Sequence, residues 1–190
     1  MRPRKEPRWR KIRSRKMRLF QYLWFHLITV ATGWLPDLRP FPWLRGFLMR
    51  PCFKRCGGNL QVARNVTINF SNRLEIGSDV FLATGCWLHD RGGILLEDEV
   101  QLGPYAALVS GDHTEIVGSY RFGPSRLAPI RICRGSWIAA HATVTKGVVV
   151  GSGAVLAANS VATRDIPPFT MAAGVPARIV QKRSRMEVVR

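Results

Sequence analysis

The sequence is poor in acidic residues, histidine and cysteine. Its 190 residues hold 12 Asp and Glu against 29 Lys and Arg, with only four histidines and four cysteines. The cysteines form no C-x-x-C pair and lack the spacing of a disulfide framework, so we expect reduced, structural thiols in a cytoplasmic compartment. The histidines include no close pair of the kind that a shared zinc ion requires. The sequence therefore predicts no metal.

No apolar run reaches the ~20 residues that a straight spanning helix needs. The longest candidate, residues 19–36, is LFQYLWFHLITVATGWLP. On a helix its polar residues gather within about 140°, and the remaining face is Leu, Phe, Trp, Ile and Val. The long basic run before it and the lack of an Ala-x-Ala site disfavour a signal peptide. The pattern favours a helix lying in a membrane interface; a short tilted spanning helix and a helix packed on the protein's own core are the alternatives.

The net charge of +17 is concentrated at the two ends of the chain. Residues 1–18 hold ten Arg or Lys and one Glu, and residues 178–190 form a second basic cluster. Basic ends around a mixed middle indicate tethering to an anionic surface, with no nucleic-acid partner for the folded part. Residues 1–58 are therefore predicted to be a basic, amphipathic arm. We expect it to hold the protein peripherally at the inner face of the cytoplasmic membrane.

A six-residue period is plain from Ile132 onward, as ICRGSW, IAAHAT, VTKGVV, VGSGAV, LAANSV and ATRDIP. The first place is aliphatic, and the fifth is mostly small or β-branched. The same frame appears upstream, as IGSDVF from Ile76 and LGPYAA from Leu102. This period fits a coil with three flat faces, in which the first place points to the axis and the fifth lies at a corner. The sequence predicts about four to five stacked coils over residues 59–170.

One segment obeys no repeat. It is SGDHTEIVGSYRFGPSRLAP, residues 110–129. The hexapeptide at Leu108 is the last before it, and the pattern resumes at Ile132, which lets a loop over residues 111–130 leave and return at one corner. Long loops on rigid scaffolds usually carry function. His113 lies where the loop departs, and an imidazole there is suited to general base chemistry.

Residues 60–170 resemble the hexapeptide-repeat transferases, whose fold is the left-handed parallel β-helix. The histidine at the loop departure, the tryptophan in GSWIAA and the tail VATRDIPPFTMAAGVPARIV at residues 161–180 are similar to galactoside and maltose O-acetyltransferases and to acetyltransferases of exopolysaccharide assembly. The resemblance implies an all-β fold: a left-handed parallel β-helix with an N-terminal α-helical arm and a short basic C-terminal tail, residues 171–190.

The resemblance also implies an activity, acetyl transfer from acetyl-CoA to a hydroxyl of a sugar or lipid-linked glycan. In the family, CoA lies in a groove between neighbouring prisms of a homotrimer. His113 would be the general base, with Asp112 or Glu115 as open candidates for orienting its imidazole. On the CoA side, two small residues would let the backbone approach pantetheine, four polar or basic residues would face the phosphates, and a tryptophan would line the groove. These residues are Trp137, Ala140, Ala158, Thr163, Arg164, Arg178 and Lys182.

The acceptor side is less defined. Asp90 and Arg91, in the segment GCWLHDRGGI at residues 85–94, are the candidates, because similar loops occur in polysaccharide acetyltransferases. Ala83 stands where sugar acetyltransferases of this family often carry an acceptor-binding asparagine, which argues against a simple galactoside or maltose acceptor. The alternative from a different class is a non-catalytic trimeric scaffold that binds lipid or nucleic acid through its basic ends.

Overall fold

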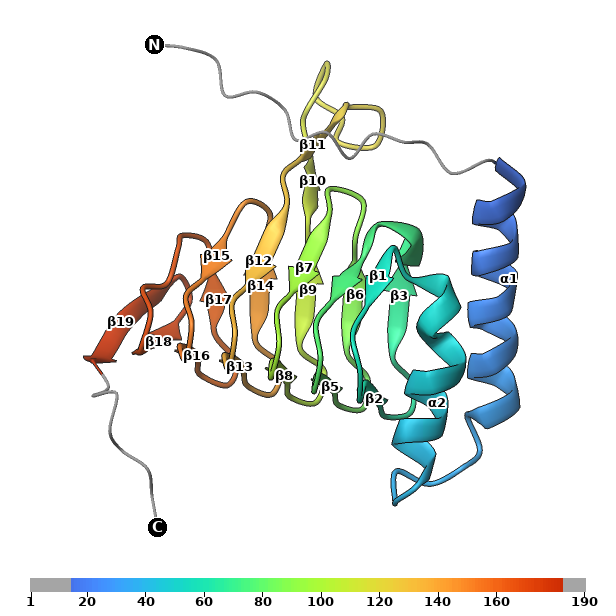
Figure 1. Ribbon diagram of the computed structural model, residues 1–190. Helices are drawn as coiled ribbons and strands as arrows, with labels where there is room; N and C mark the ends of the chain where they lie inside the picture. Colours follow the sequence, from blue (N-terminus) through green and yellow to red (C-terminus); the bar gives the residue numbers. More distant parts are fainter. Residues whose placement is uncertain (1–14, 183–190) are drawn as a thin grey trace, which may run out of the picture.

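The computed structural model describes residues 15–182 of the protein, and the predicted basic termini lie largely outside this range. The chain winds into a prism with three parallel β-sheet faces and about six turns, a left-handed parallel β-helix (Figure 1). Two helices, α1 (Arg15–Thr32) and α2 (Phe41–Met49), cover its N-terminal end. The predicted fold class is confirmed.

Each face of the prism collects one short strand from every turn. Face A contains β1 (Arg55–Cys56), β4 (Glu75–Ile76), β7 (Ile94–Leu96), β12 (Ile130–Ile132) and β15 (Val149–Val150). Face B contains β2 (Gln61–Val62), β5 (Phe81–Leu82), β8 (Gln101–Leu102), β13 (Trp137–Ile138), β16 (Val155–Leu156), β18 (Thr170–Gly174) and β19 (Ala177–Lys182). Face C contains β3 (Thr67–Asn69), β6 (Trp87–His89), β9 (Ala107–Val109), β14 (Thr143–Thr145) and β17 (Val161–Ala162).

The first-place aliphatic residues stack in register along the axis. On face B, Leu82 pairs with Leu102, which pairs with Ile138, and all three side chains are fully buried. Burying one such side chain contributes about 1.5–3 kcal/mol relative to leaving it exposed. The fifth-place residues, such as Ala142 and Ala154, are buried at the corners. The hexapeptide reading is therefore confirmed in residue-level detail.

The structure moves both predicted boundaries of the coil outward, to β1 at the start and to β19 at the end. β1 already pairs with β4, so the first turn begins before residue 59. Residues 171–182 are not a free tail, because β18 and β19 form an antiparallel hairpin that ends face B. Neither segment follows the six-residue pattern, which is why the sequence indicated fewer turns.

The arm packs on the coil. Phe25 and Ile28 of α1 belong to the buried core, and Gln21 Nε2 donates a hydrogen bond to the carbonyl of Pro51 at 2.9 Å. The helix predicted at residues 19–36 is present, but it extends from residue 15 to residue 32. In the range 15–182, no helix combines the length and hydropathy required to span a bilayer.

Candidate active site

The excursion leaves the prism where the sequence placed it. After β9 on face C, the chain forms a short antiparallel hairpin of β10 (Gly111–His113) and β11 (Ser125–Leu127), then re-enters the coil as β12 on face A. The loop thus replaces one corner turn between faces C and A, and it projects from the prism (Figure 1). Because the stack continues on both sides, the hairpin has a rigid base.

His113 lies at the end of β10, opposite Ser125. Its side chain is exposed, and within residues 15–182 its imidazole makes no hydrogen bond. Its ring is therefore available to a hydroxyl arriving from solvent. This is the arrangement a general base requires before substrate binds.

Neither candidate orienting carboxylate contacts His113. Asp112 points to the other side of its strand, where Lys146 Nζ lies 3.1 Å from its Oδ2. Glu115 Oε1 accepts a hydrogen bond from the backbone N–H of Gly118 at 3.0 Å and so shapes the loop tip. Both acidic residues have other partners, so among residues 15–182 the imidazole has no carboxylate partner.

The turn Asp90–Gly93, between β6 and β7, lies beside the base of the hairpin. Arg91 Nη1 donates a hydrogen bond to Ser125 Oγ at 2.9 Å, and Ser125 is the residue paired with His113. Ser110 holds the turn from below, because its hydroxyl donates to the carbonyl of His89 and accepts from Gly92 N–H, both at 2.8 Å. The structure therefore brings Arg91 and His113 to one corner, although they are 22 positions apart in the chain.

Asp90 does not reach the surface. Its side chain is 0% exposed, and neither carboxyl oxygen has a hydrogen-bond partner. Burial raises the pKa of Asp90 to about 8, against the opposing effects of Arg73 and the backbone amides of Gly93 and Ile94. These amides lie near the carboxyl group, but none meets the geometry of a hydrogen bond. The expectation that Asp90 contacts an acceptor is therefore not met in this conformation, since the side chain is fully buried.

His89 is a second residue at this corner that the sequence did not mark as functional. The pKa of His89 is held below its usual range by burial, by the Arg91 guanidinium and by His113. A backbone hydrogen bond of His89 itself acts in the opposite direction. Its Nδ1 is buried without a partner, and its ring meets Phe70 edge-on at 5.6 Å between centroids. His89 is therefore expected to be neutral near the exposed imidazole of His113. The repeat pattern did not mark His89 and Asp90, because their burial depends on the turn.

The residues expected to hold CoA fall into two groups. Thr163 and Arg164 follow β17, at the same corner as His113 and further along the coil. The others lie on face B, at the corner after it or on the final hairpin, and all of them are at least partly exposed: Trp137, Ala140, Ala158, Arg178 and Lys182. Face C separates the two groups within one chain.

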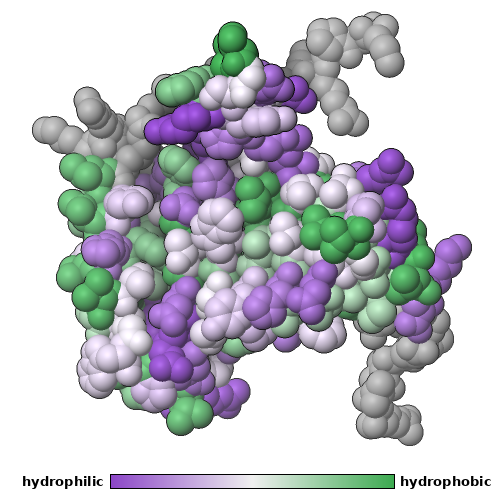
Figure 2. All heavy atoms as spheres, turned by 180° about the vertical axis from the view of Figure 1, so that it is seen from behind, coloured by the Kyte–Doolittle hydropathy of each residue, from purple (hydrophilic) through white to green (hydrophobic). Residues whose placement is uncertain are grey.

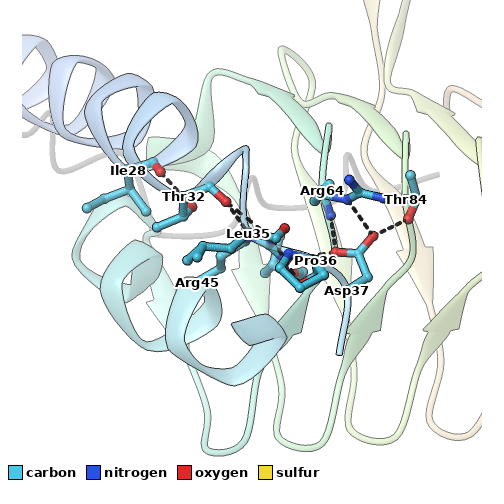
Figure 3. Close-up of polar contacts among 9 residues, drawn as sticks. Ile28, Thr32, Leu35, Pro36, Asp37, Arg45, Arg64 and Thr84 are labelled. Atoms are coloured by element: carbon cyan, nitrogen blue, oxygen red, sulfur yellow. Dashed lines mark hydrogen bonds and ion pairs between the residues drawn. The ribbon is translucent and has the colours of Figure 1, made fainter. Parts of the chain in front are cut away.

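A polar junction fixes the arm to the first turns of the coil (Figure 3). Arg45, which is 2% exposed, donates to the carbonyls of Thr32 and Leu35 and to Asp37 Oδ1, the last at 2.8 Å. Asp37 also accepts hydrogen bonds from Arg64 N–H and from the Thr84 hydroxyl, at 2.8 and 2.7 Å. Burial alone would raise the pKa of Asp37, but the bonds from Thr84 and Arg64 and the charge of Arg45 outweigh it and lower the value.

The junction accounts for the departure at positions 83 and 84. Ala83 is buried, and the Thr84 hydroxyl is occupied by Asp37. No sequence pattern indicated this junction, because its members come from the arm and two different turns of the coil.

The cysteines are also structural: all four are free thiols, and burial raises the pKa of Cys52 and Cys86 to about 12. Among residues 15–182, no group of three or more His, Cys, Asp or Glu side chains is placed to hold a metal ion.

The structure is a left-handed β-helix of hexapeptide turns with an exposed histidine at the base of a corner loop. These are the features expected of a hexapeptide-repeat acetyltransferase, and comparison with known proteins supports this class. The protein SACOL2570 of Staphylococcus aureus (strain COL), named as an acetyltransferase, is 30% identical over 135 residues, covering 71% of this chain and 68% of that protein. The galactoside O-acetyltransferase of Escherichia coli (strain K12) is 28% identical over 138 residues, covering 73% of this chain and 68% of the enzyme. No protein-family model matches the chain.

Solved structures show the same fold. The maltose O-acetyltransferase of Clostridium difficile 630 superimposes with a TM-score of 0.77 at 24% identity, covering 90% of each chain. The hexapeptide-repeat acetyltransferase VCA0836 of Vibrio cholerae, solved with acetyl-CoA, gives a TM-score of 0.74 at 24% identity, covering 87% of this chain and 88% of that one. This chain belongs to the hexapeptide-repeat acetyltransferases, as the sequence motifs indicated.

Proposed function

We propose that this protein is an O-acetyltransferase that moves an acetyl group from acetyl-CoA to a hydroxyl of a sugar or lipid-linked glycan. The observation that carries the proposal is the imidazole of His113, which is exposed at a corner of the family's coil and makes no hydrogen bond with the described part of the chain. Family membership supports the reaction class, and the acetyl-CoA bound to the Vibrio cholerae structure supports the donor.

In the proposed reaction, His113 takes the proton of the acceptor hydroxyl while the hydroxyl oxygen attacks the thioester carbonyl carbon. An ester C–O bond forms, the C–S bond breaks, and the proton passes from the imidazole to the departing CoA sulfur. A positioned general base typically contributes 10²–10⁴-fold to such a step. Low-pKa His89 beneath the site adds no competing positive charge to the corner.

The acceptor side is assigned to Arg91, whose guanidinium is exposed next to the hairpin. Arg91 can donate hydrogen bonds to sugar hydroxyls or to the phosphate of a lipid-linked sugar, because a guanidinium is a planar, permanently charged donor. Asp90 acts as a positioning residue: its buried carboxyl group lies inside the turn that presents Arg91.

The CoA groove is proposed to form between copies in a homotrimer. His113 and the face B group, which includes Trp137, lie on different corners of one prism, so they meet only if a second copy supplies one of them. The small side chains of Ala140, which is half-buried, and Ala158, which is exposed, would leave backbone amides accessible to pantetheine. Arg164, Arg178 and Lys182 are exposed cations suited to the phosphates, with Thr163 as a hydroxyl donor next to Arg164.

The test is the rate of CoA release and of radiolabelled acetyl transfer from acetyl-CoA to membrane-derived glycolipids and to soluble sugars. His113→Ala should lower the rate of transfer about 10²–10⁴-fold, with an unchanged circular dichroism spectrum. His26→Ala, on the exposed side of α1, is the matched control and should keep the wild-type rate. A folded His113→Ala protein that transfers acetyl groups at the wild-type rate rules out His113 as the base.

The alternative is a non-catalytic trimer that binds lipid or nucleic acid through its basic ends. It is favoured if the wild-type protein releases no CoA with any acceptor but still binds vesicles or nucleic acid.

A further inference from the structure

The outward side of α1 is an exposed apolar surface. We define the outer strip as six side chains, five on α1 and Trp34 just after its end, that are between 53% and 77% exposed: Leu19, Phe20, Leu23, Leu27, Val30 and Trp34. Figure 2 shows hydrophobic side chains along the edge of the molecule that α1 occupies. Soluble proteins seldom leave a contiguous apolar surface of this kind uncovered, and such surfaces mark interaction sites.

Two polar residues of α1 lie on the side of the helix that faces the protein. Gln21 and Thr32 are 1% and 5% exposed and face the coil, together with Phe25 and Ile28. A surface helix normally turns its polar face to water and its apolar face to the core. In α1 both faces carry large apolar groups, and two of its polar side chains, Gln21 and Thr32, are turned inward.

Specific hydrogen bonds hold α1 in this rotation. Gln21 Nε2 donates to the Pro51 carbonyl, and the indole N–H of Trp24 donates to the Leu48 carbonyl, both at 2.9 Å. Rotating the helix to hide the outer strip would break both bonds and pull Phe25 out of the core. The outward apolar face is therefore a property of the fold.

The outer strip lies at one end of the prism. In Figure 1, α1 is the outermost element at the N-terminal end of the coil, beyond α2 and the first strands. Copies that pack side by side along the prism faces leave this end uncovered. A second copy is thus a poorer occupant than a flat surface facing the end of the prism.

Charge identifies the flat surface. Residues 1–18, which lead directly into the outer strip, contain ten Arg or Lys and one Glu. Basic residues beside an apolar helix face are the combination that binds anionic bilayers: the apolar side enters the headgroup region and the cations contact the acidic headgroups.

We propose that the outer strip of α1 docks on an anionic lipid bilayer, at the inner face of the cytoplasmic membrane. The helix lies in the plane of the interface, and the coil projects from it into the aqueous phase. The hydrogen bonds of Gln21 and Trp24 keep the inward side of α1 on the protein, so docking needs no rearrangement of the arm. This inference is independent of the proposed reaction.

The experiment is cosedimentation of the full-length protein with vesicles of about 3:1 phosphatidylcholine to phosphatidylserine, and with phosphatidylcholine alone. The wild type should bind the acidic vesicles, and about 0.5 M salt should weaken this binding without abolishing it. The double variant Leu23→Gln/Leu27→Gln should bind at least about tenfold more weakly, because both changes remove apolar surface from the strip. Circular dichroism checks that the variant is folded, as expected for side chains already exposed.

The matched control removes exposed apolar surface elsewhere. Val117 and Phe122, at the tip of the hairpin loop, are 99% and 80% exposed, so Val117→Gln/Phe122→Gln should bind vesicles as the wild type does. Equal losses in both double variants contradict docking through α1, as does wild-type binding by the α1 variant. If the α1 substitutions instead change the oligomeric state in sedimentation velocity without lipid and leave vesicle binding intact, the strip is an interface between copies and the proposal is wrong.

Discussion

Asp37, whose side chain is 23% exposed, and Asp90, which is fully buried, have opposite surroundings. Asp37, at the junction of arm and coil, accepts hydrogen bonds from Arg45, Arg64 and Thr84, and its pKa is lowered. Asp90, at the corner that carries His113, is fully buried without a hydrogen-bond partner, and its pKa is raised to about 8. One carboxyl group is stabilised in its charged form and the other in its neutral form.

The difference distinguishes a polar network that stabilises the fold from a buried polar group that costs stability near the proposed site. A fully satisfied polar network stabilises one arrangement of the chain, whereas an unsatisfied buried group costs stability. The junction therefore accounts for the rigid attachment of α1 and α2. The unsatisfied carboxyl group of Asp90 lies beside the residues proposed to handle the acceptor, where such a cost is tolerated.

The largest expected effect breaks the junction. Arg45→Met should lower the free energy of unfolding by about 3–5 kcal/mol, because the Asp37 charge and the carbonyls of Thr32 and Leu35 lose their buried partner. Denaturant unfolding at constant protein concentration measures the loss. Arg64→Met is the control; its side chain is 45% exposed, so the loss should stay within about 1 kcal/mol. Equal losses in the two variants would refute the view that Arg45 organises the junction.

The next effect removes the cost at the corner. Asp90→Asn should raise the free energy of unfolding by about 2 kcal/mol above pH 8, because an amide carries no charge to be desolvated. The folded pKa of Asp90 lies above the unfolded value of 3.8, so wild-type stability should fall as the pH rises from about 4 to about 8. Unfolding measured across this range should show that the slope is smaller in Asp90→Asn. An unchanged slope means that Asp90 is ionised in the folded protein.

The opposite pH dependence is expected from Asp37. Its folded pKa is below the ordinary 3.8, so its contribution is complete above that pH and is lost as the pH falls through the lowered value. Thermal unfolding below pH 4 should show the loss in the wild type. Asp37→Asn, although less stable throughout, should have a flatter profile in this acidic range.

The smallest effect tests one bond of the junction. Thr84→Val removes the hydroxyl that donates to Asp37 and keeps the shape of the side chain, so the free energy of unfolding should fall by about 1 kcal/mol. Thr163→Val is a matched control, since Thr163 is exposed and distant from the junction, and it should leave stability within about 0.5 kcal/mol of wild type.

Much of the coil was predictable, because each turn needs the same type of side chain at the same place and so produces a six-residue period in the sequence. Ile132, Ile138 and Val144 each begin a hexapeptide, and each is fully buried at the axis. The interruption marked the loop and His113 for the same reason. β1 and the final β18–β19 hairpin were missed, because strands that cap a stack need not carry its period.

The site was predictable only in part. Position or motif made His113, Trp137 and Arg91 candidates, and the structure shows all three exposed. The burial of Asp90 and the proximity of Arg91 to Ser125 were not predictable, because they arise from the turn and the hairpin meeting across the corner.

The sequence by itself determined the three-faced coil, its register and the corner where the loop leaves. It could do so because each turn of the stack imposes the same demand on the same place of the repeat. Only the tertiary structure decided which side of α1 faces outward and which aspartate is satisfied. Those outcomes depend on partners such as Pro51, 30 positions from Gln21, and Thr84, 47 positions from Asp37, and no local pattern encodes them.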